Sequence, residues 1–239
     1  TGLSFRWKSG FKFNPNMAEP GPETVLGKGY GGDPAQLEEI HAVLGDLAVH
    51  PATADHIARK LVVHFVSDTP DPALVDHVAA RFRDTHGDLA QVYAALLEHP
   101  AAWGPELRNV KPPLDFIASA CRALAVHPAH LKQVDPRKLA RGLVTPMVLM
   151  GQPWERSNGP DGWPEEDEAW ITPQGLAARM RWAMLAPRQL VNRLPSPEKF
   201  VEISLGDYAD GPVRFAASAA ETQAEAIGLV LCSPAFQRR

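Results

Sequence analysis

The sequence predicts an all-α fold, an irregular multi-helix bundle with a small β-hairpin at its N-terminal end. Apolar residues recur at three- and four-residue steps over most of the 239 positions, which is typical of amphipathic helices. Many of these stretches begin with a proline in the first turn, where its missing N–H costs nothing. We therefore expect one helical domain over residues 1–239, made of a hairpin 4–13, a loop 14–34 and a helical body 35–239.

The hairpin is predicted by aromatic residues that alternate with polar ones. Phe5 and Trp7 precede the turn, and Phe11 and Phe13 follow it. Gly10 can take the positive φ of a three-residue turn. Because a lone hairpin is marginal in water, we expect it to pack against another part of the protein, or to pair with chain outside this sequence. The Pro- and Gly-rich residues 14–34 are expected to form an irregular loop.

The helices of the body are predicted one by one from their apolar stripes and start signals. Thr53 is the expected N-cap of the second helix, and Pro146 is expected to kink or end the helix that contains it. The expected helices begin near residues 37, 53, 72, 89, 113, 136, 172 and 196, and the last covers about 212–231.

Composition and charge exclude several classes of protein. The net charge of −4 and the pI near 6.1 argue against a nucleic-acid partner. No apolar run approaches the roughly 20 residues of a membrane-spanning helix. No signal peptide is visible, and because the chain starts at Thr1 without Met, we expect its natural N-terminus to be missing. Cys121 lies at an apolar helix position, so a buried free thiol is favoured over a disulfide with Cys232.

The histidines do not predict a metal or a cofactor. His50, His56 and His64 could supply three ligands. However, His56 and His64 are eight residues apart, about 80° out of alignment on a helix, and no His-Glu-x-x-His pair exists. We expect His64 to be a buried neutral ring that is bonded to a carbonyl or to Asp68. Signatures of serine hydrolases, phosphate-binding loops and Cys-x-x-Cys sites are also absent.

The loop 151–164 is the most promising surface feature. Trp154 and Trp163 offer flat faces to a sugar or peptide, and Asn158 and Asp161 offer hydrogen bonds. The favoured alternative is a rigid Ω-like loop whose tryptophans pack on the helical body.

Charged residues within apolar helix patterns are further candidates. Lys111 precedes a double proline, and Arg122 lies on an otherwise apolar helix, where Asp115 could pair with it. Such pairs are more often structural than catalytic. The acidic run 165–168 is expected to be a solvated loop.

Several motifs together resemble a bacterial family called domain of unknown function 1800. They include His50-Pro51-Ala52-Thr53-Ala54 with His64-Phe65-Val66-Ser67-Asp68, then Glu19-Pro20-Gly21-Pro22, Gly151-Gln152-Pro153 and the closing Ser233-Pro234-Ala235-Phe236-Gln237-Arg238-Arg239. The resemblance covers nearly the whole chain, in the same order. One position departs from it, because Ala18 stands where the family often has a histidine.

The resemblance implies a cellular location and a protein partner, but it implies no enzymatic activity. Members are roughly twice this length, so the chain would be the C-terminal half, with a helical N-terminal half missing. They often look exported, which implies a periplasmic or extracellular location. Their genes often lie beside those of an exported family with a sulfatase-like fold, which implies a protein partner.

Three functions remain open at this point. The first is a binding or assembly module that docks an exported partner or a wall polymer. The second is a hydrolase whose cleft, shared with the missing half, gathers His64, Asp68, Lys111, Arg122 and the loop 151–164. The third is carbohydrate binding through Trp154 and Trp163. We favour the first, and the sequence leaves the oligomeric state open.

Overall fold

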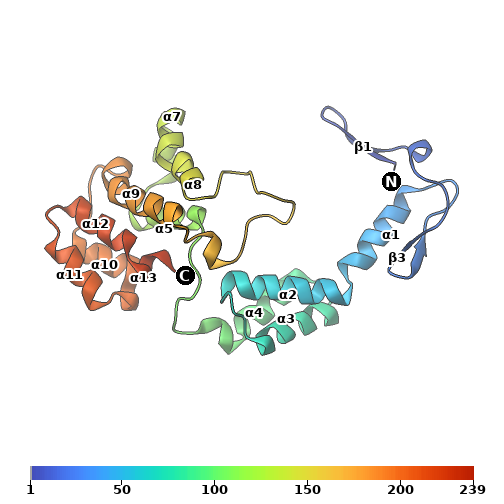
Figure 1. Ribbon diagram of the computed structural model, residues 1–239, viewed down its shortest axis with the longest axis horizontal. Helices are drawn as coiled ribbons and strands as arrows, with labels where there is room; N and C mark the ends of the chain where they lie inside the picture. The colour runs from blue at the N-terminus through green and yellow to red at the C-terminus, as the bar shows by residue number, and fades with distance from the viewer. Residues whose placement is uncertain (1) are drawn as a thin grey trace. The chain divides into compact units, whose positions relative to one another are not determined.

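The computed structural model describes residues 2–239, which divide into two compact units. Unit 1 comprises the residues up to Val62 together with Asp71–Ala102, and unit 2 comprises Val63–Pro70 and Trp103–Arg239. The predicted fold class is confirmed, since the elements are mostly helices and a hairpin stands near the N-terminal end (Figure 1). No helix in the described chain has both the length and the apolar character needed to cross a membrane.

The hairpin of unit 1 forms as predicted, but its aromatic side chains are not buried by the rest of unit 1. Strands β1 (Leu3–Arg6) and β2 (Gly10–Phe13) are antiparallel, and Gly10 has a φ of 70°. Phe5 lies opposite Phe11, with 5.1 Å between the ring centroids. Both rings are nevertheless exposed, and Trp7 keeps 92% of its surface. The rest of unit 1 therefore does not supply the surface on which we expected the hairpin to pack.

The irregular loop expected over residues 14–34 is wrong in its second half. Strands β3 (Glu23–Val25) and β4 (Lys28–Tyr30) form another small hairpin. Its two turn residues, Leu26 and Gly27, have φ values of 50° and 80°, which a tight two-residue turn requires. A leucine rarely takes this conformation, so only Gly27 of the two central residues matched the usual sequence of such a turn.

Helix α1 (Leu37–Ala48) is anchored to the second hairpin by polar contacts. Asp46 accepts a hydrogen bond from Lys28 Nζ at 2.5 Å and another from Tyr30 Oη at 2.6 Å. The predicted apolar stripe is present, but no side chain of α1 is buried. Leu44, for example, remains 58% exposed.

The core of unit 1 lies among three further helices, α2 (Pro51–Phe65), α3 (Pro72–Asp84) and α4 (Leu89–Glu98). Helix α2 begins at Pro51 and not after Thr53, because the His50 ring acts as the cap: its Nδ1 accepts the N–H of Ala52 at 3.1 Å. Buried side chains from all three helices form the core, namely Ala54, Ala58, Val62, Leu74, Val78, Phe82, Val92 and Leu96.

Unit 2 contains the remaining helices. They are α5 (Pro113–Ala123), α6 (Pro128–Leu131), α7 (Pro136–Leu139), a π-helix (Ala140–Val144), α8 (Thr145–Leu149), α9 (Pro173–Leu190), α10 (Pro197–Leu205), α11 (Gly211–Ala219), α12 (Gln223–Cys232) and α13 (Pro234–Gln237). Short 3₁₀ turns in the chain cover Pro15–Met17, Pro100–Trp103, Asp167–Ala169 and Gly206–Tyr208.

The core of unit 2 is built around the contact between α9 and α12. A Cβ placed on Gly228 would lie only 2.7 Å from Met184 Sδ and 3.2 Å from the carbonyl oxygen of Ala183. The two helices therefore meet with almost no side chain between them at this point. Around the contact lie large buried side chains, including Phe116, Met147, Trp182, Phe200, Ile227 and Phe236.

Two helix boundaries differ from the prediction for local reasons. The chain stays helical past Pro146, because a π-helix precedes it and Thr145 donates its N–H to the carbonyl of Ala140. The single helix expected over 212–231 is two helices, α11 and α12. The second has its own N-cap, Thr222, whose hydroxyl accepts the N–H of Glu225 at 3.2 Å.

Both cysteines are free thiols and partly buried, as favoured from the sequence. Burial raises the pKa of Cys121 and of Cys232 to about 11. They are therefore thiols and not thiolates at neutral pH.

Candidate functional site

A cavity of about 310 Å³ in unit 2 gathers several of the predicted site residues. Three of them, His64, Asp161 and Trp163, line it, although His64 comes from the short first segment of unit 2, Val63–Pro70, and the other two from its second segment, Trp103–Arg239. All of its lining belongs to that unit. The lining residues are His64, Pro112, Asp115, Gln152, Asp161, Gly162, Trp163, Pro164, Glu165 and Trp170.

His64 and Glu165 form the polar centre of this cavity. The distance between His64 Nδ1 and Glu165 Oε2 is 2.5 Å, and the two side chains keep 35% and 25% of their surface. Because a carboxylate accepts, Nδ1 carries the proton in this pair, and Nε2 is the ring nitrogen that does not contact Glu165. The expected partners of His64, a carbonyl or Asp68, are thus wrong for the ring.

A guanidinium covers one face of the His64 ring. Arg239 Nη2 lies 3.5 Å from Nδ1 and 3.4 Å from Nε2, and it donates to the backbone oxygen of His64 at 3.1 Å. Nearly equal distances to both ring nitrogens place the guanidinium above the ring and not in line with either nitrogen. The contact between Arg239 Nη2 and His64 Nε2, at 3.4 Å, is long for a hydrogen bond.

Backbone contacts hold His64 and Arg239 in place. Asn109 Nδ2 donates to the carbonyl oxygens of Val63 at 2.7 Å and of His64 at 2.9 Å, which caps the end of α2. Asn109 and Arg239 also exchange backbone hydrogen bonds of 2.8 and 3.2 Å. The segment around Asn109 thus joins the last turn of α2 to residue 239.

The acidic run 165–168 is not a purely solvated loop, and this corrects the expectation. Asp68 Oδ2 accepts the N–H of Asp167 at 2.7 Å, and Asp167 Oδ1 accepts the N–H of Val110 at 2.7 Å. Burial, together with the charge of Asp68, raises the pKa of Asp167. These bonds fix the run and place Glu165 beside His64, so Asp68 positions the site without lining it.

The expected pair of Asp115 and Arg122 is wrong. Asp115 pairs with Arg239, while Arg122 is exposed and does not line the cavity. Seven residues along a helix correspond to a rise of about 10.5 Å, which is too far for a direct ion pair.

The loop 151–164 lines the cavity near its two ends, through Gln152 and through residues 161–164, but not through the residues between them. Trp163 is half-buried and lies 6.2 Å from the buried ring of Trp170. The indole Nε1 of Trp170 is buried and has no hydrogen-bond partner among the described residues. Trp154 and Asn158 are exposed and do not line the cavity. The loop therefore divides, with one tryptophan packed and the other in solvent.

Lys111 lies beside the site in a structural role. Its Nζ donates to the carbonyl oxygen of Phe236 at 2.7 Å and lies 4.2 Å from the centre of that ring. Burial lowers the pKa of Lys111 to about 8, the nearby charge of Asp115 raises it, and that of Arg239 lowers it. Among the described residues, no group of three His, Cys, Asp or Glu side chains has a geometry that could hold a metal ion.

The second candidate surface is the N-terminal segment, defined here as residues 2–50. Gly2 is its only buried residue, although the segment contains two hairpins and a 12-residue helix. It exposes large apolar side chains from every one of these elements, including Phe5, Trp7, Phe11, Met17, Leu26 and Leu44. The sequence indicated this feature only at the first hairpin, which was expected to need another surface to pack on. For α1 the apolar periodicity predicted a buried face, which unit 1 does not provide.

Comparison with known proteins identifies a family. A sequence profile described as "Protein of unknown function (DUF1800)" matches residues 1–238. No curated protein and no solved structure matches the chain.

Proposed function

The chain belongs to the DUF1800 family, whose description assigns no activity, and we propose that it is a binding or assembly module that acts with a protein partner. One observation carries this proposal: the N-terminal segment folds into regular elements yet buries only Gly2. The setting we propose is an exported bacterial protein, and the proposed partner is the exported sulfatase-like protein implied by gene neighbourhood.

The physical argument rests on what such elements need. Two-stranded hairpins and helices of about 12 residues are marginal in water without a packed face. The exposed rings of Phe5, Trp7 and Phe11 are large apolar surfaces of the kind that interfaces bury. Covering them with a partner would supply the apolar contact that the segment lacks within unit 1.

The test uses a matched pair of exposed aromatic residues. The chain is co-expressed with the sulfatase-like protein, and the complex is measured by affinity purification and size-exclusion chromatography with light scattering. Phe11→Ser should weaken the complex at least tenfold, because Phe11 is 75% exposed in the N-terminal segment. Phe215→Ser should leave it unchanged, because Phe215 is 73% exposed but lies on α11 of unit 2.

Two results would count against the proposal. If both variants bind the partner equally well, the hairpin is not the docking surface. If light scattering shows a stable homodimer that Phe11→Ser dissociates, the surface is covered by a second copy and not by another protein.

A second candidate function is hydrolysis, possible because His64, Glu165, Asp161 and Trp163 share one cavity. Glu165 orients the ring, and Nε2 of His64, whose contact with Arg239 Nη2 is long at 3.4 Å, would act as the base that accepts a proton from water or from a substrate hydroxyl. The indole N–H of Trp170, which has no partner among the described residues, would be a donor for a substrate oxygen that reaches it. An aromatic face beside carboxylates suits a carbohydrate, the third possibility considered above.

Chromogenic glycosides and esters test this candidate on the full chain. His64→Gln should reduce hydrolysis at least 100-fold, in the range of general-base contributions. His56→Gln, an exposed histidine on the same helix, is the control. A glycan array compared with Trp163→Ala tests sugar binding without catalysis. Equal hydrolysis by wild type and His64→Gln would rule out this role.

A further inference from the structure

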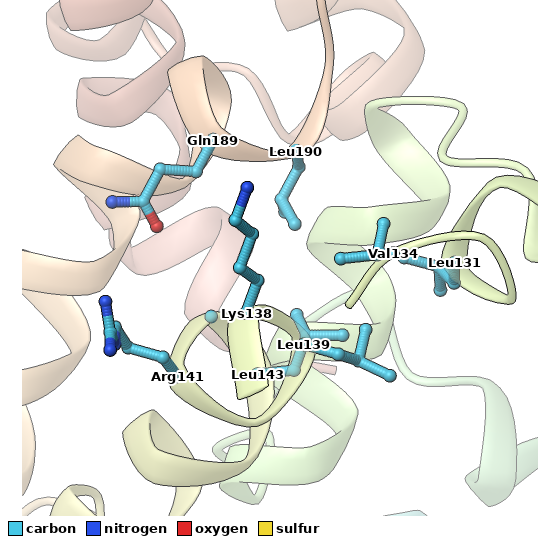
Figure 2. Close-up of a pocket in the computed structure, with 9 residues that line it drawn as sticks. Leu131, Val134, Lys138, Leu139, Arg141, Leu143, Gln189 and Leu190 are labelled. Carbon is cyan, nitrogen blue, oxygen red and sulfur yellow. The ribbon is translucent and has the colours of Figure 1, made fainter. Parts of the chain in front are cut away.

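A separate cavity of about 290 Å³ lies in unit 2, away from His64. It is formed by α6, α7, the π-helix and the C-terminal end of α9, as Figure 2 shows. None of the candidate site residues lines it. Its lining consists of Leu131, Val134, Lys138, Leu139, Arg141, Gly142, Leu143, Gln189 and Leu190.

The lining of this cavity is divided between hydrocarbon and positive charge. The polar groups are the Lys138 ammonium, the Arg141 guanidinium and the Gln189 amide, and Figure 2 shows Arg141 and Gln189 on one side of the Lys138 side chain. Val134 and Leu131 lie on the other side. The aliphatic residues are all half-buried, namely Leu131, Val134, Leu139, Leu143 and Leu190.

The two cations have no anionic partner in the described chain. Neither Lys138 nor Arg141 forms an ion pair there, and no Asp or Glu lines the cavity. The nearest acid in sequence, Asp135, uses Oδ1 to cap α7 by accepting the N–H groups of Arg137 at 2.9 Å and Lys138 at 3.2 Å. The cavity is thus positively charged on one side and has a free place for an anion.

The π-helix is an independent observation at the same place. π-helices are rare and often occur at functional sites. Here the widened turn brings both Arg141 and Leu143 to the cavity, so that one segment supplies a cation and a hydrocarbon wall. Its Gly142 carbonyl accepts the indole N–H of the buried Trp182 at 2.8 Å, which ties the segment to α9.

We propose that this cavity binds an aliphatic carboxylate, with its chain against the leucines and Val134 and its carboxylate between Lys138 and Arg141. Charge-assisted hydrogen bonds to Arg and Lys are the usual way in which proteins hold carboxylates. The volume is at the lower end for ligand cavities, so a chain of about eight carbons fits better than a long one.

The experiment titrates octanoate into the full chain by isothermal calorimetry, with octanol and octyltrimethylammonium as matched ligands. We expect saturable 1:1 binding of octanoate and at least tenfold weaker binding of the other two. The indole N–H signal of Trp182 in an NMR spectrum should shift on binding, because its acceptor Gly142 lines the cavity.

Substitutions localise the binding. Lys138→Gln with Arg141→Gln should weaken octanoate binding at least tenfold, while Arg137→Gln, an exposed cation on the same helix that does not line the cavity, should not. Because both replaced side chains are exposed, the double variant should keep the wild-type melting temperature. Absent binding, equal affinity for octanol, or equal weakening by Arg137→Gln would overturn the proposal.

Discussion

Lys111 is the residue whose surroundings give the clearest pH dependence. Its pKa is about 8 in the folded chain and near 10.5 when unfolded, chiefly because of burial. Between these values the unfolded chain binds a proton that the native state has released, so this residue makes the unfolding free energy rise with pH. At neutral pH the ammonium is charged in both states, and its burial costs stability.

Replacing Lys111 with Met should remove this dependence. We compare the unfolding free energy of Lys111→Met with that of wild type. The difference, variant minus wild type, should decrease by on the order of 1 kcal/mol as the pH rises from 8 to about 10.5. Urea unfolding at pH 7, 9 and 10.5 measures it, and the cysteine contributions cancel because both proteins share them. A difference that stays constant over this range would show that Lys111 is solvated.

Arg179 is the largest fully buried side chain, and its partners explain why it is tolerated. The guanidinium donates to Gln237 Oε1 at 3.0 Å and to the carbonyl oxygen of Lys111 at 2.8 Å, and it lies over the ring of Phe116 at 5.3 Å. We expect Arg179→Ala to lower the unfolding free energy by about 2–5 kcal/mol, because two buried acceptors lose their donors. Arg181→Ala, an exposed neighbour, should change it by less than about 0.5 kcal/mol in the same denaturant titration.

At the scale of elements, two glycines in helices should respond in opposite ways to alanine. Gly228→Ala should destabilise the protein by about 1–3 kcal/mol, because the new methyl would overlap Met184 at the contact of α9 and α12. Gly45→Ala should stabilise it by about 0.5–1 kcal/mol, because Gly45 lies in α1 with no atom within 4 Å of the new methyl. Thermal unfolding of both variants checks the pair, and a loss of stability in each would mean that α1 is more tightly packed than described.

Most helix starts could be predicted because their signals are local. At Pro72, Pro136 and Pro173 a proline occupies the first turn, and an Asp or Thr before it accepts a backbone N–H. One kind of N-terminal cap, in which a histidine ring accepts the backbone N–H, was not predicted from the sequence. In the three His-Pro-Ala sequences, the Nδ1 of His50, His99 and His127 accepts the N–H two residues further on, at 3.1–3.2 Å.

Elements that depend on unusual backbone or on competing caps could not be predicted. The turn of the second hairpin requires Leu26 in the left-handed conformation. The break between α11 and α12 occurs where the Thr222 hydroxyl caps α12, although the apolar pattern continues through this point. Propensity and periodicity describe average behaviour, so a single cap or turn residue can override them.

At the scale of the whole molecule, the candidate site shows the limit of a single sequence. His64 and Trp163 were predicted as site residues, but the partner of His64 lies 101 residues away in an acidic run that seemed solvated. Arg239, which covers the ring, lies 175 residues from His64. Such contacts arise only when distant segments pack, and neither spacing nor composition encodes them.

The two kinds of packing in the molecule should differ in amide exchange. Residues 2–50 have only Gly2 buried, whereas α9 and α12 share a large apolar core. Hydrogen exchange of the isolated chain should therefore be at least 100-fold faster in α1 than in α12, since local opening of α1 exposes little apolar surface. Comparable protection in both helices would contradict the proposed need for a partner, and slowing of α1 on partner addition would support it.

The loop 151–164 separates two runs of helices that nevertheless fill one interior. Phe116 and Met147 come from before it, while Trp182 and Ile227 come from after it. A protease nick after the exposed Asn158 would remove one covalent link and none of the buried contacts. The two fragments should therefore stay bound to each other without the covalent link. If the fragments are expressed separately, the extent of their association measures how well the core of unit 2 forms.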